Sequence, residues 1–314
     1  MTVKNKLVTV IGGGGFVGRY VVQSLLRDGA RVRIAERDPR RAWFLKPLGG
    51  LGQTQFVAAD VTRPDTIARA VAGADGVVNL VGLLAGDFGR VHVDGARNVA
   101  EAAARVGVAG LVHVSAIGAD PSSRSAYGRT KGEGEAAVRD AFPAAQIVRP
   151  SVVFGREDAF VNRFAGMVAK APVVPVLRAG VKFQPVFAGD VGDAIAAATA
   201  AVIDGRAGET YELGGPDILT MGELIRWIAA TIGRTPSILE LPDIAGAMIA
   251  RLPGAPISRD QWLMLQRDNV AAAGMPGLAA LGIAPTPLAA VAPEWLVRFR
   301  RKGRFNRRVS HLAA

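Results

Sequence analysis

Short apolar runs, often β-branched, alternate with stretches of helical periodicity through the first 150 residues. The apolar runs predict strands at Leu7–Ile11, Arg31–Ala35, Thr54–Val57, Gly76–Val81, Leu111–Ser115 and Gln146–Val148. The stretches between them predict amphipathic helices at Val17–Arg27, Asp65–Ala72, Val93–Val106 and Gly128–Ala141. Alternation at this spacing is typical of right-handed βαβ units. We therefore expect an α/β fold, a doubly wound parallel sheet of Rossmann type.

After Pro150 the alternation loosens, and prolines and glycines become frequent. Helices are predicted at Met221–Ile232 and Asp243–Leu252, separated by irregular segments. We expect a Rossmann domain over residues 1–150, a smaller C-terminal α/β lobe over residues 151–296 that returns partly to the sheet, and a basic tail over residues 297–314.

The composition excludes several kinds of crosslink, metal site and catalytic nucleophile. Half of the 314 residues are hydrophobic, which is enough for a large core, and the chain has no cysteine. Disulfides, thiolate metal sites and a cysteine nucleophile are therefore excluded. The three histidines, His92, His113 and His311, form no ligand pair, so we predict no metal site.

Neither a secretion signal nor a membrane span is predicted. The first apolar run is about five residues long and leads directly into glycines, too short for a signal-peptide core. No segment offers the ~20 apolar residues of a spanning helix.

Positive charge gathers at the C-terminus. The net charge is +11, and seven basic residues lie between Arg298 and Arg308, which leaves +4 for the rest. This tail predicts contact with anionic headgroups, although a solvated, disordered tail is the plainer alternative. Phe299 and Phe305 interleave with its arginines, as in nucleic-acid binders, but nothing else in the sequence supports nucleic acid. The apolar segment Leu241–Ile257 is too short to span a bilayer; it predicts either an interfacial helix or packing on the second lobe.

Four glycines separate the first strand from the first helix. The registers Gly12-x-x-Gly15-x-x-Gly18 and Gly13-x-Gly15-x-x-Gly18 both fit a dinucleotide-binding turn, which needs a tight turn, close approach to pyrophosphate and close helix packing. The phosphates then sit on the helix N-terminus, at Phe16 and Val17.

The end of the second strand, "RIAERDPRR", selects between the two dinucleotides. Glu36 favours NADH, because a carboxylate accepts from ribose hydroxyls; Arg37, backed by Arg40 or Arg41, favours NADPH through a 2′-phosphate. We predict NADPH over NADH, on condition that Glu36 points away.

Tyr127 and Lys131 lie four residues apart at the start of a predicted helix and so share a face. A lysine ammonium beside a phenol lowers the pKa of the phenol, which predicts Tyr127 as a proton donor or acceptor during hydride transfer. We expect Ser115, at the end of the preceding predicted strand, to polarise the substrate carbonyl. The alternative is an exposed pair without function.

These motifs resemble the short-chain dehydrogenase/reductase superfamily, in its extended and atypical branches. The matching residues are "GGGGFVG", Asp60-Val61, "NLVG", "YGRTK" and "RPSVVFG". The resemblance implies that adenine contacts Asp60 and Val61, that Asn79 and Gly82 line the cofactor, and that Pro150 and Val153 meet the nicotinamide. Two departures weaken a catalytic interpretation: Ala116 stands where a second serine is usual, and the glycine turn lacks the usual Ala-Thr.

A narrower resemblance runs from about Leu7 to about Leu296. The stretches "FVGRYVV", "VRDAFPAAQIVRPSVVFGREDAFVNRFAGM", "QPVFAGDVGDAI" and "MPGLAALGIAPTPL" are similar to the nucleotide-binding accessory subunits of respiratory complex I and their bacterial relatives. That family is implied to hold NADPH tightly without turnover, beside peripheral-arm subunits at the membrane junction. The lack of a long organelle-targeting leader fits a bacterial relative, so we expect a peripheral protein at the cytoplasmic face of the inner membrane, or otherwise a cytoplasmic one.

Three functions remain open. The first is a complex I accessory subunit with a mainly structural nucleotide, and the second is a free-standing NADPH-dependent reductase, dehydrogenase or epimerase that uses Tyr127 and Lys131 with Ser115. The third is an NmrA-like redox-sensing regulator, against which the Tyr–Lys pair counts.

Overall fold

The computed structural model describes residues 2–206, 208–252 and 257–301. Its centre is a seven-stranded sheet in the order β11-β6-β5-β4-β1-β2-β3, and every neighbouring pair is parallel. The strands are β1 (Leu7–Ile11), β2 (Arg31–Glu36), β3 (Thr54–Ala58), β4 (Gly76–Asn79), β5 (Gly110–Val114), β6 (Gln146–Pro150) and β11 (Thr210–Leu213). The predicted doubly wound α/β fold is confirmed.

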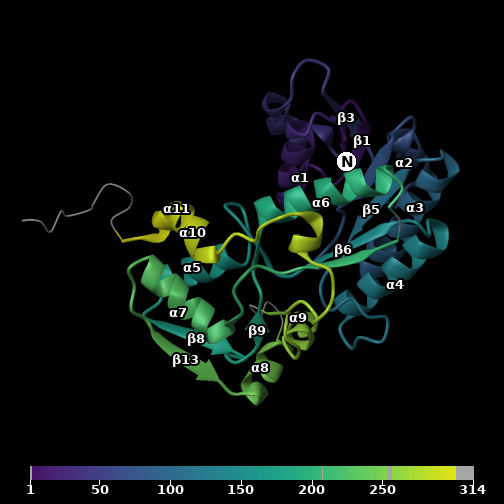
Figure 1. Ribbon diagram of the computed structural model, residues 1–314. Coiled ribbons are helices and arrows are strands. Elements are labelled where there is room, and N and C mark those ends of the chain that lie inside the picture. Colours follow the sequence, from purple (N-terminus) through teal and green to yellow (C-terminus); the bar gives the residue numbers. More distant parts are fainter. Residues whose placement is uncertain (1, 207, 253–256, 302–314) are drawn as a thin grey trace, which may run out of the picture.

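Helices cover both faces of this sheet (Figure 1). One face carries α1 (Phe16–Arg27) and α6 (Ala188–Ile203), and the other carries α2 (Pro64–Val71), α3 (Gly95–Arg105) and α4 (Ala126–Ala141). Successive strand residues point to opposite faces, so the β-branched runs fill two cores at once. In β1, Val8 and Val10 pack beneath α1 and α6, whereas Ile11 packs with the helices of the second face.

The strand order reverses at β1, which pairs with β2 on one side and with β4 on the other. In such sheets the crevice at the carboxyl ends of the strands, at this reversal, is where ligands bind. The strand predicted to reach Val81 ends at Asn79, because the Asn79 side chain accepts the Val81 N–H at 3.1 Å and turns the chain. The helix predicted from Val93 is preceded by a π-helical turn, η2 (Gly89–Asp94), before α3 starts.

Residues after Pro150 supply β11 and α6 to the sheet layer and build a second lobe. The short strands are β7 (Val153–Phe154), β8 (Val173–Leu177), β9 (Lys182–Phe183), β10 (Val186–Phe187), β12 (Leu219–Thr220) and β13 (Ser237–Leu241). The helices are α5 (Val161–Lys170), α7 (Met221–Thr231), α8 (Asp243–Ile249), α9 (Arg259–Met264), α10 (Leu288–Val291) and α11 (Pro293–Leu296), with 3₁₀ segments η1 (Pro39–Leu48), η3 (Leu278–Leu281) and η4 (Val297–Phe299). Phe154, Leu224 and Trp295 belong to the core of this lobe.

Helix α8 is only half covered by the protein. Gly246 lies directly against the Trp262 ring of α9, whereas Ile244, Met248 and Leu252 are 76%, 64% and 62% exposed. The predicted segment Leu241–Ile257 thus packs one side on the second lobe and presents the other to solvent; its residues 253–256 lie outside the described part.

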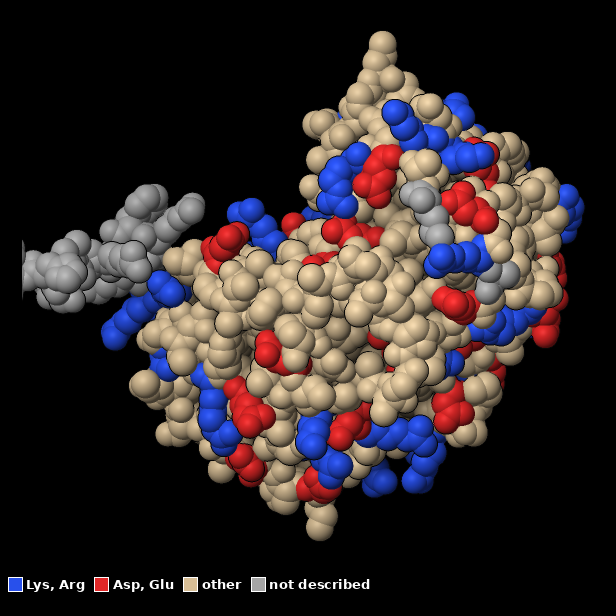
Figure 2. All heavy atoms as spheres, viewed as in Figure 1, with Lys and Arg blue, Asp and Glu red and all other residues tan. Residues whose placement is uncertain are grey.

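Across the ranges that the structure describes, no helix is both long and apolar enough to cross a membrane. Acidic and basic side chains are mixed over the face shown in Figure 2. Most of the basic tail, from residue 302 onward, lies outside the described residues.

Candidate functional site

The glycine turn lies in the crevice where the strand order reverses. Gly12 follows β1 with a φ of 84°, a left-handed conformation that favours glycine. Its N–H donates to the Ala35 carbonyl at 2.9 Å, and its carbonyl accepts from Gly15 at 3.1 Å. At Gly18 a Cβ atom would lie 2.3 Å from the Gly12 oxygen, so only glycine lets α1 approach the strand this closely.

The N-terminus of α1 lies in the crevice, directly after the glycine turn. Helix α1 starts at Phe16, and its N-cap residue, Gly15, has no side chain to accept the first N–H groups of the helix. Phe16 and Val17 therefore stand where backbone donors and the helix dipole favour a phosphate. A Cβ on Gly155 would lie 3.1 Å from the Phe16 ring, so the segment after β7 borders the same crevice.

Glu36 takes a position that the NADPH prediction did not allow. Its carboxylate accepts the Gly14 N–H at 2.6 Å, so it points into the glycine turn rather than away from it. Burial raises the pKa of Glu36, while the Gly14 hydrogen bond and nearby Arg37 act to lower it. The condition attached to the NADPH prediction is therefore not met in this structure, since a 2′-phosphate near Arg37 would meet this carboxylate.

The residues that follow β3 and β4 lie at the same carboxyl edge of the sheet and border the crevice. Asp60 accepts from the Thr62 backbone and hydroxyl at 2.9 and 2.8 Å; burial acts to raise the pKa of Asp60, but these hydrogen bonds hold it below its usual value. Val61 is buried against Gly95, where a Cβ would lie 2.8 Å from the valine side chain. At Gly82 a Cβ would lie 3.2 Å from the Lys131 ammonium, which brings the turn after β4 next to α4.

Tyr127 and Lys131 both lie on α4, but their electrostatics differ from the prediction. Burial raises the pKa of Tyr127 to about 12, so the expectation that Lys131 lowers it is wrong in this structure. The Lys131 ammonium donates instead to the Val114 carbonyl at 3.1 Å, and burial lowers the pKa of Lys131 to about 8. Tyr127 is thus held as a neutral phenol.

A histidine that the sequence did not single out joins these elements. The His92 Nε2 accepts the Leu83 N–H at 2.9 Å, so Nδ1 carries the proton and donates to Thr130 Oγ1 at 3.0 Å. Its ring stacks on Phe88 at 5.3 Å and meets Tyr127 edge-on at 5.5 Å. His92 therefore ties the turn after β4 to α4 and fixes one side of the Tyr127 ring.

At the carboxyl end of β5, two buried polar atoms have no hydrogen-bond partner among the described residues. They are Nε2 of His113 and Oγ of Ser115, which stand at the end of β5 and just beyond it. His113 donates or accepts through Nδ1 with Asn79 at 3.2 Å, and burial lowers its pKa to about 3. Unpaired buried groups are costly, which makes this edge of the sheet a place where a polar ligand group is expected.

The start of α4 is anchored from the second lobe. Asp260 of α9 accepts from Ser125 Oγ at 3.0 Å, from Ala126 N at 2.6 Å and from Tyr127 N at 3.1 Å. A carboxylate at a helix N-terminus satisfies free N–H groups and complements the helix dipole. The turn that carries Tyr127 is therefore positioned by the C-terminal lobe.

Comparison with known proteins agrees with this geometry. Residues 8–214 match the model of the NAD dependent epimerase/dehydratase family. The chain belongs to that family. The turn, the crevice and the α4 residues described above are thus those of an epimerase/dehydratase family member.

Among curated proteins, the chain is 36% identical to "NADH dehydrogenase [ubiquinone] 1 alpha subcomplex subunit 9, mitochondrial" of Rattus norvegicus, over 95% of this chain and 82% of the relative. It is 32% identical to "Ceramide reductase" of Caulobacter vibrioides, over 77% of each chain. Among solved structures, an NADPH-dependent quinone oxidoreductase from Escherichia coli superposes with a TM-score of 0.75 at 20% identity, over 92% of this chain and 99% of that chain. The predicted resemblance to complex I subunit 9 is confirmed.

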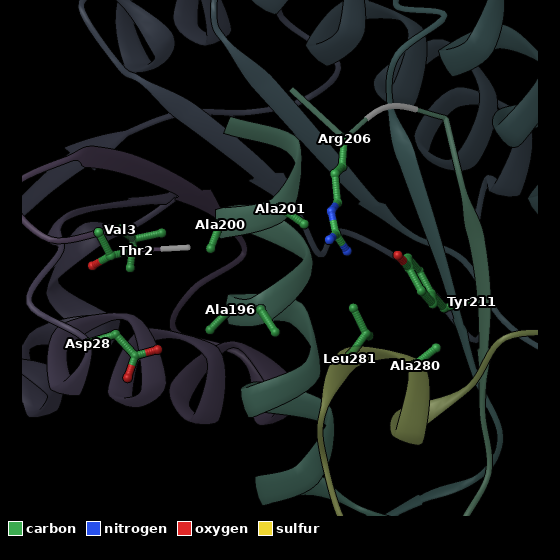
Figure 3. A pocket seen from close by; sticks show the side chains of 11 residues that line it. Thr2, Val3, Asp28, Ala196, Ala200, Ala201, Arg206, Tyr211, Ala280 and Leu281 are labelled. Atoms are coloured by element: carbon green, nitrogen blue, oxygen red, sulfur yellow. The ribbon is translucent and has the colours of Figure 1, made fainter. Parts of the chain in front are cut away.

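A cavity of about 540 Å³ lies elsewhere on this family member (Figure 3). It is lined by alanines of α6, with Asp28 on one side and Arg206 and Tyr211 on the other. Thr2 and Val3, which precede β1, also line it, so it opens at the amino ends of the strands. The glycine turn is at the carboxyl ends, so this cavity is separate from the dinucleotide crevice.

The structure gathers most of the predicted residues around one crevice and adds three that were not predicted from the sequence. Pro150 ends β6, and Val153 stands in β7 at the lobe boundary. The added residues are His92, His113 and Asp260. A polar residue inside the apolar run "LVHV" was a signal for His113, whereas the sequence carries no local signal that joins Asp260 to α4.

Proposed function

We propose that this protein is a dinucleotide-binding accessory subunit of respiratory complex I. The observation that carries the proposal is the 36% identity with the rat alpha subcomplex subunit 9 over 95% of this chain, which spans the glycine turn and the second lobe alike. Similarity over both lobes supports a shared role of the whole protein, not only a shared nucleotide fold.

The dinucleotide in this proposal is mainly structural. Its pyrophosphate binds the N-terminus of α1, and its nicotinamide end lies toward Tyr127, Lys131 and Ser115. One contact supports a holding role over turnover: the Lys131 ammonium donates to the Val114 carbonyl and not to the Tyr127 phenol. A ligand in this crevice contacts the turns after β1, β3 and β4 and so stabilises the sheet edge.

Either dinucleotide is compatible with the charges at the end of β2. Arg37 favours the 2′-phosphate of NADPH, and the position of Glu36 favours the ribose hydroxyls of NADH. We keep NADPH as the proposed ligand and expect Glu36 to leave the Gly14 N–H when it binds.

We further propose a peripheral position at the cytoplasmic face of a bacterial inner membrane, next to peripheral-arm subunits. The relatives named as subunits of NADH dehydrogenase support such an assembly. The basic tail, rich in arginine, is proposed to face anionic headgroups; each cation near such a surface contributes on the order of 1 kcal/mol.

The test is extraction of native membranes in mild detergent, followed by capture through an N-terminal tag that leaves the tail free. Stoichiometric complex I subunits with a retained dinucleotide are the expected result. A protein captured alone, with a freely exchanging dinucleotide, would overturn the accessory-subunit proposal.

A free-standing reductase is the second candidate, favoured by the similarity to a ceramide reductase and by the cluster of Tyr127, Lys131 and Ser115. A bound dinucleotide supplies hydride in such a reaction. A neutral Tyr127 phenol is suited to donate a proton to a carbonyl oxygen, and the unpaired Ser115 Oγ is suited to hydrogen-bond the same oxygen.

The reductase candidate is tested by NADPH consumption with a panel of carbonyl compounds that includes long-chain amide ketones of ceramide type. Tyr127→Phe is expected to abolish turnover while it leaves dinucleotide affinity nearly unchanged. Turnover that survives this substitution would refute the proposed role of the phenol.

A further inference from the structure

The segment that follows β2 exposes more apolar surface than its own fold requires. Within residues 40–51, Trp43, Phe44 and Leu48 are 49%, 48% and 46% exposed, and Leu51 is 108% exposed. These four residues are close together in the sequence and lie on η1 and the glycine-rich turn after it, "GGLG". The segment projects from the Rossmann half of the molecule, at the top of Figure 1.

The exposure follows from how η1 packs. Its buried residues are Ala42 and Leu45, which join the core under α1. These two anchor one side of the 3₁₀ segment, so the bulkier Trp43, Phe44 and Leu48 are left outside. Because Ala42 and Leu45 hold η1 against the core, the exposed side of η1 is a fixed surface.

Cations surround these apolar side chains. Residues 40–51 contain Arg40, Arg41 and Lys46 and no acidic residue. The Lys46 ammonium lies 4.3 Å from the centre of the Trp43 ring, and the Arg19 guanidinium lies 4.9 Å from that of Phe44. The nearest preceding acid, Asp38, is paired with Arg40 at 3.0 Å. The surface is therefore both apolar and positively charged.

We propose that this aromatic–basic surface, formed by Arg40, Arg41, Trp43, Phe44, Lys46, Leu48 and Leu51, docks on an anionic phospholipid bilayer. Tryptophan and phenylalanine favour the headgroup level, and a fully exposed leucine beyond them is placed to enter the acyl boundary. With Asp38 balancing the charge of Arg40, Arg41 and Lys46 are the cations that complement lipid phosphates.

A difference in charge distinguishes this surface from a second apolar surface, the exposed side of α8. Residues 239–267 carry three arginines and three carboxylates, so that region is neutral overall. Of these two surfaces, as far as the described residues show, the aromatic–basic surface is the one that joins exposed apolar side chains with unbalanced positive charge. An anionic membrane therefore fits the aromatic–basic surface and not the α8 side.

The test measures co-sedimentation of the full chain with vesicles of equal parts phosphatidylglycerol and phosphatidylcholine, and with vesicles of phosphatidylcholine alone. The wild type is expected to prefer the anionic vesicles. Leu51→Ser is expected to weaken binding about tenfold, because it removes one leucine from the acyl boundary. Ile218→Ser is the matched control, since Ile218 is 52% exposed on the second lobe, away from this surface.

A second readout follows Trp43 itself. Trp262 and Trp295 are buried and Trp227 is partly buried, whereas Trp43 is 49% exposed, so insertion of Trp43 is expected to shift the tryptophan emission to the blue. Trp43→Phe, which keeps an apolar ring, is expected to retain binding and lose most of that shift.

Two results would overturn the proposal. One is a wild type that does not bind anionic vesicles. This result overturns the proposal even if the same surface is needed for capture with other proteins. The other is equal vesicle binding by the wild type and Leu51→Ser, which would assign membrane contact to the basic tail. Neither result depends on the dinucleotide or on complex I, so the proposed function is tested separately.

Discussion

Two neighbouring side chains at the end of β2 act in opposite directions on the choice of dinucleotide. Glu36→Ala is expected to strengthen NADPH binding relative to NADH about tenfold, because it removes a carboxylate that faces the glycine turn. Arg37→Ala is expected to weaken NADPH binding more than NADH binding by a similar factor. The measurement is the ratio of the two dissociation constants, from nicotinamide fluorescence.

Arg31→Ala provides the control for a general loss of positive charge. Arg31 is exposed at the first position of β2, at the opposite end of the strand from Glu36, and is not assigned to the cofactor. Equal losses of NADPH and NADH in Arg37→Ala would contradict the 2′-phosphate contact.

The two buried histidines make stability depend on pH. Burial, with the positive charge of Lys131, lowers the pKa of His92 to about 4, and burial lowers that of His113 to about 3. In the unfolded chain both protonate near their ordinary value of about 6.5, so the unfolded state binds more protons below that pH. The free energy of unfolding is therefore expected to fall as pH drops from about 6.5 toward about 4, by about 3 kcal/mol through His92 alone.

The contribution of His92 is isolated by His92→Gln, which keeps hydrogen-bonding atoms but does not titrate. Urea unfolding of both proteins across this pH range is expected to show a shallower decline for the variant. Parallel profiles would show that His92 is not held neutral by the fold.

At the scale of elements, the joint between the lobes sets the position of α4. Asp260→Ala removes three hydrogen bonds at the N-terminus of α4 and is expected to cost about 1–2 kcal/mol of stability. Because the first turn carries Tyr127, the same change is expected to raise the dissociation constant of the dinucleotide several-fold. Thermal unfolding and fluorescence titration measure the two effects.

The matched control for Asp260 is Arg267→Ala. Arg267 pairs with Asp120 at 3.5 Å and links the same two parts of the protein without touching the N-terminus of α4. A mostly exposed pair contributes roughly 0–1 kcal/mol, so little change is expected. Similar losses in both variants would mean that Asp260 acts only as a general link between the lobes.

The same elements show how far the sequence could predict the site. The six strands before Pro150 were predicted to within two residues of their ends, because residues of a parallel strand that is covered on both faces must nearly all be apolar. The seventh strand of the sheet, β11, was not predicted. The glycine turn was found because a local backbone constraint leaves a local pattern. Asp260 meets α4 from 134 positions beyond Ala126, and a contact of that range depends on packing that no local pattern encodes.

The sequence also could not predict the direction in which functional side chains point. The sequence identified Glu36 and Lys131, but not that one would accept from Gly14 and the other donate to Val114. The expected effect of Lys131 on Tyr127 assumed that helical spacing alone sets their interaction. In the folded protein, a backbone carbonyl binds the ammonium and burial decides the pKa of the phenol.

On the scale of the whole molecule, the two apolar surfaces lie at opposite ends: the segment after β2 at the top of Figure 1 and α8 at the bottom. A flat bilayer contacts one end of a globular protein, not both. If the positively charged surface lies on lipid, the neutral side of α8 points away from that lipid surface. Ile244 and Met248 stand four residues apart on α8 and so share one face, and exposed Leu252 follows the helix; this apolar side is suited to a neighbouring protein subunit.

This arrangement predicts that substitutions on one surface reduce vesicle binding and that substitutions on the other reduce binding to protein subunits. Ile244→Ser combined with Met248→Ser is expected to lower the yield of complex I subunits in tag capture about tenfold and to leave vesicle binding unchanged. Both side chains are exposed, so the double variant is expected to fold with an unaltered melting temperature. Leu51→Ser is expected to do the reverse, weakening vesicle binding while subunits still co-purify in detergent. Loss of both properties in either variant would mean that membrane and protein contacts share one surface, which the separation seen in Figure 1 argues against.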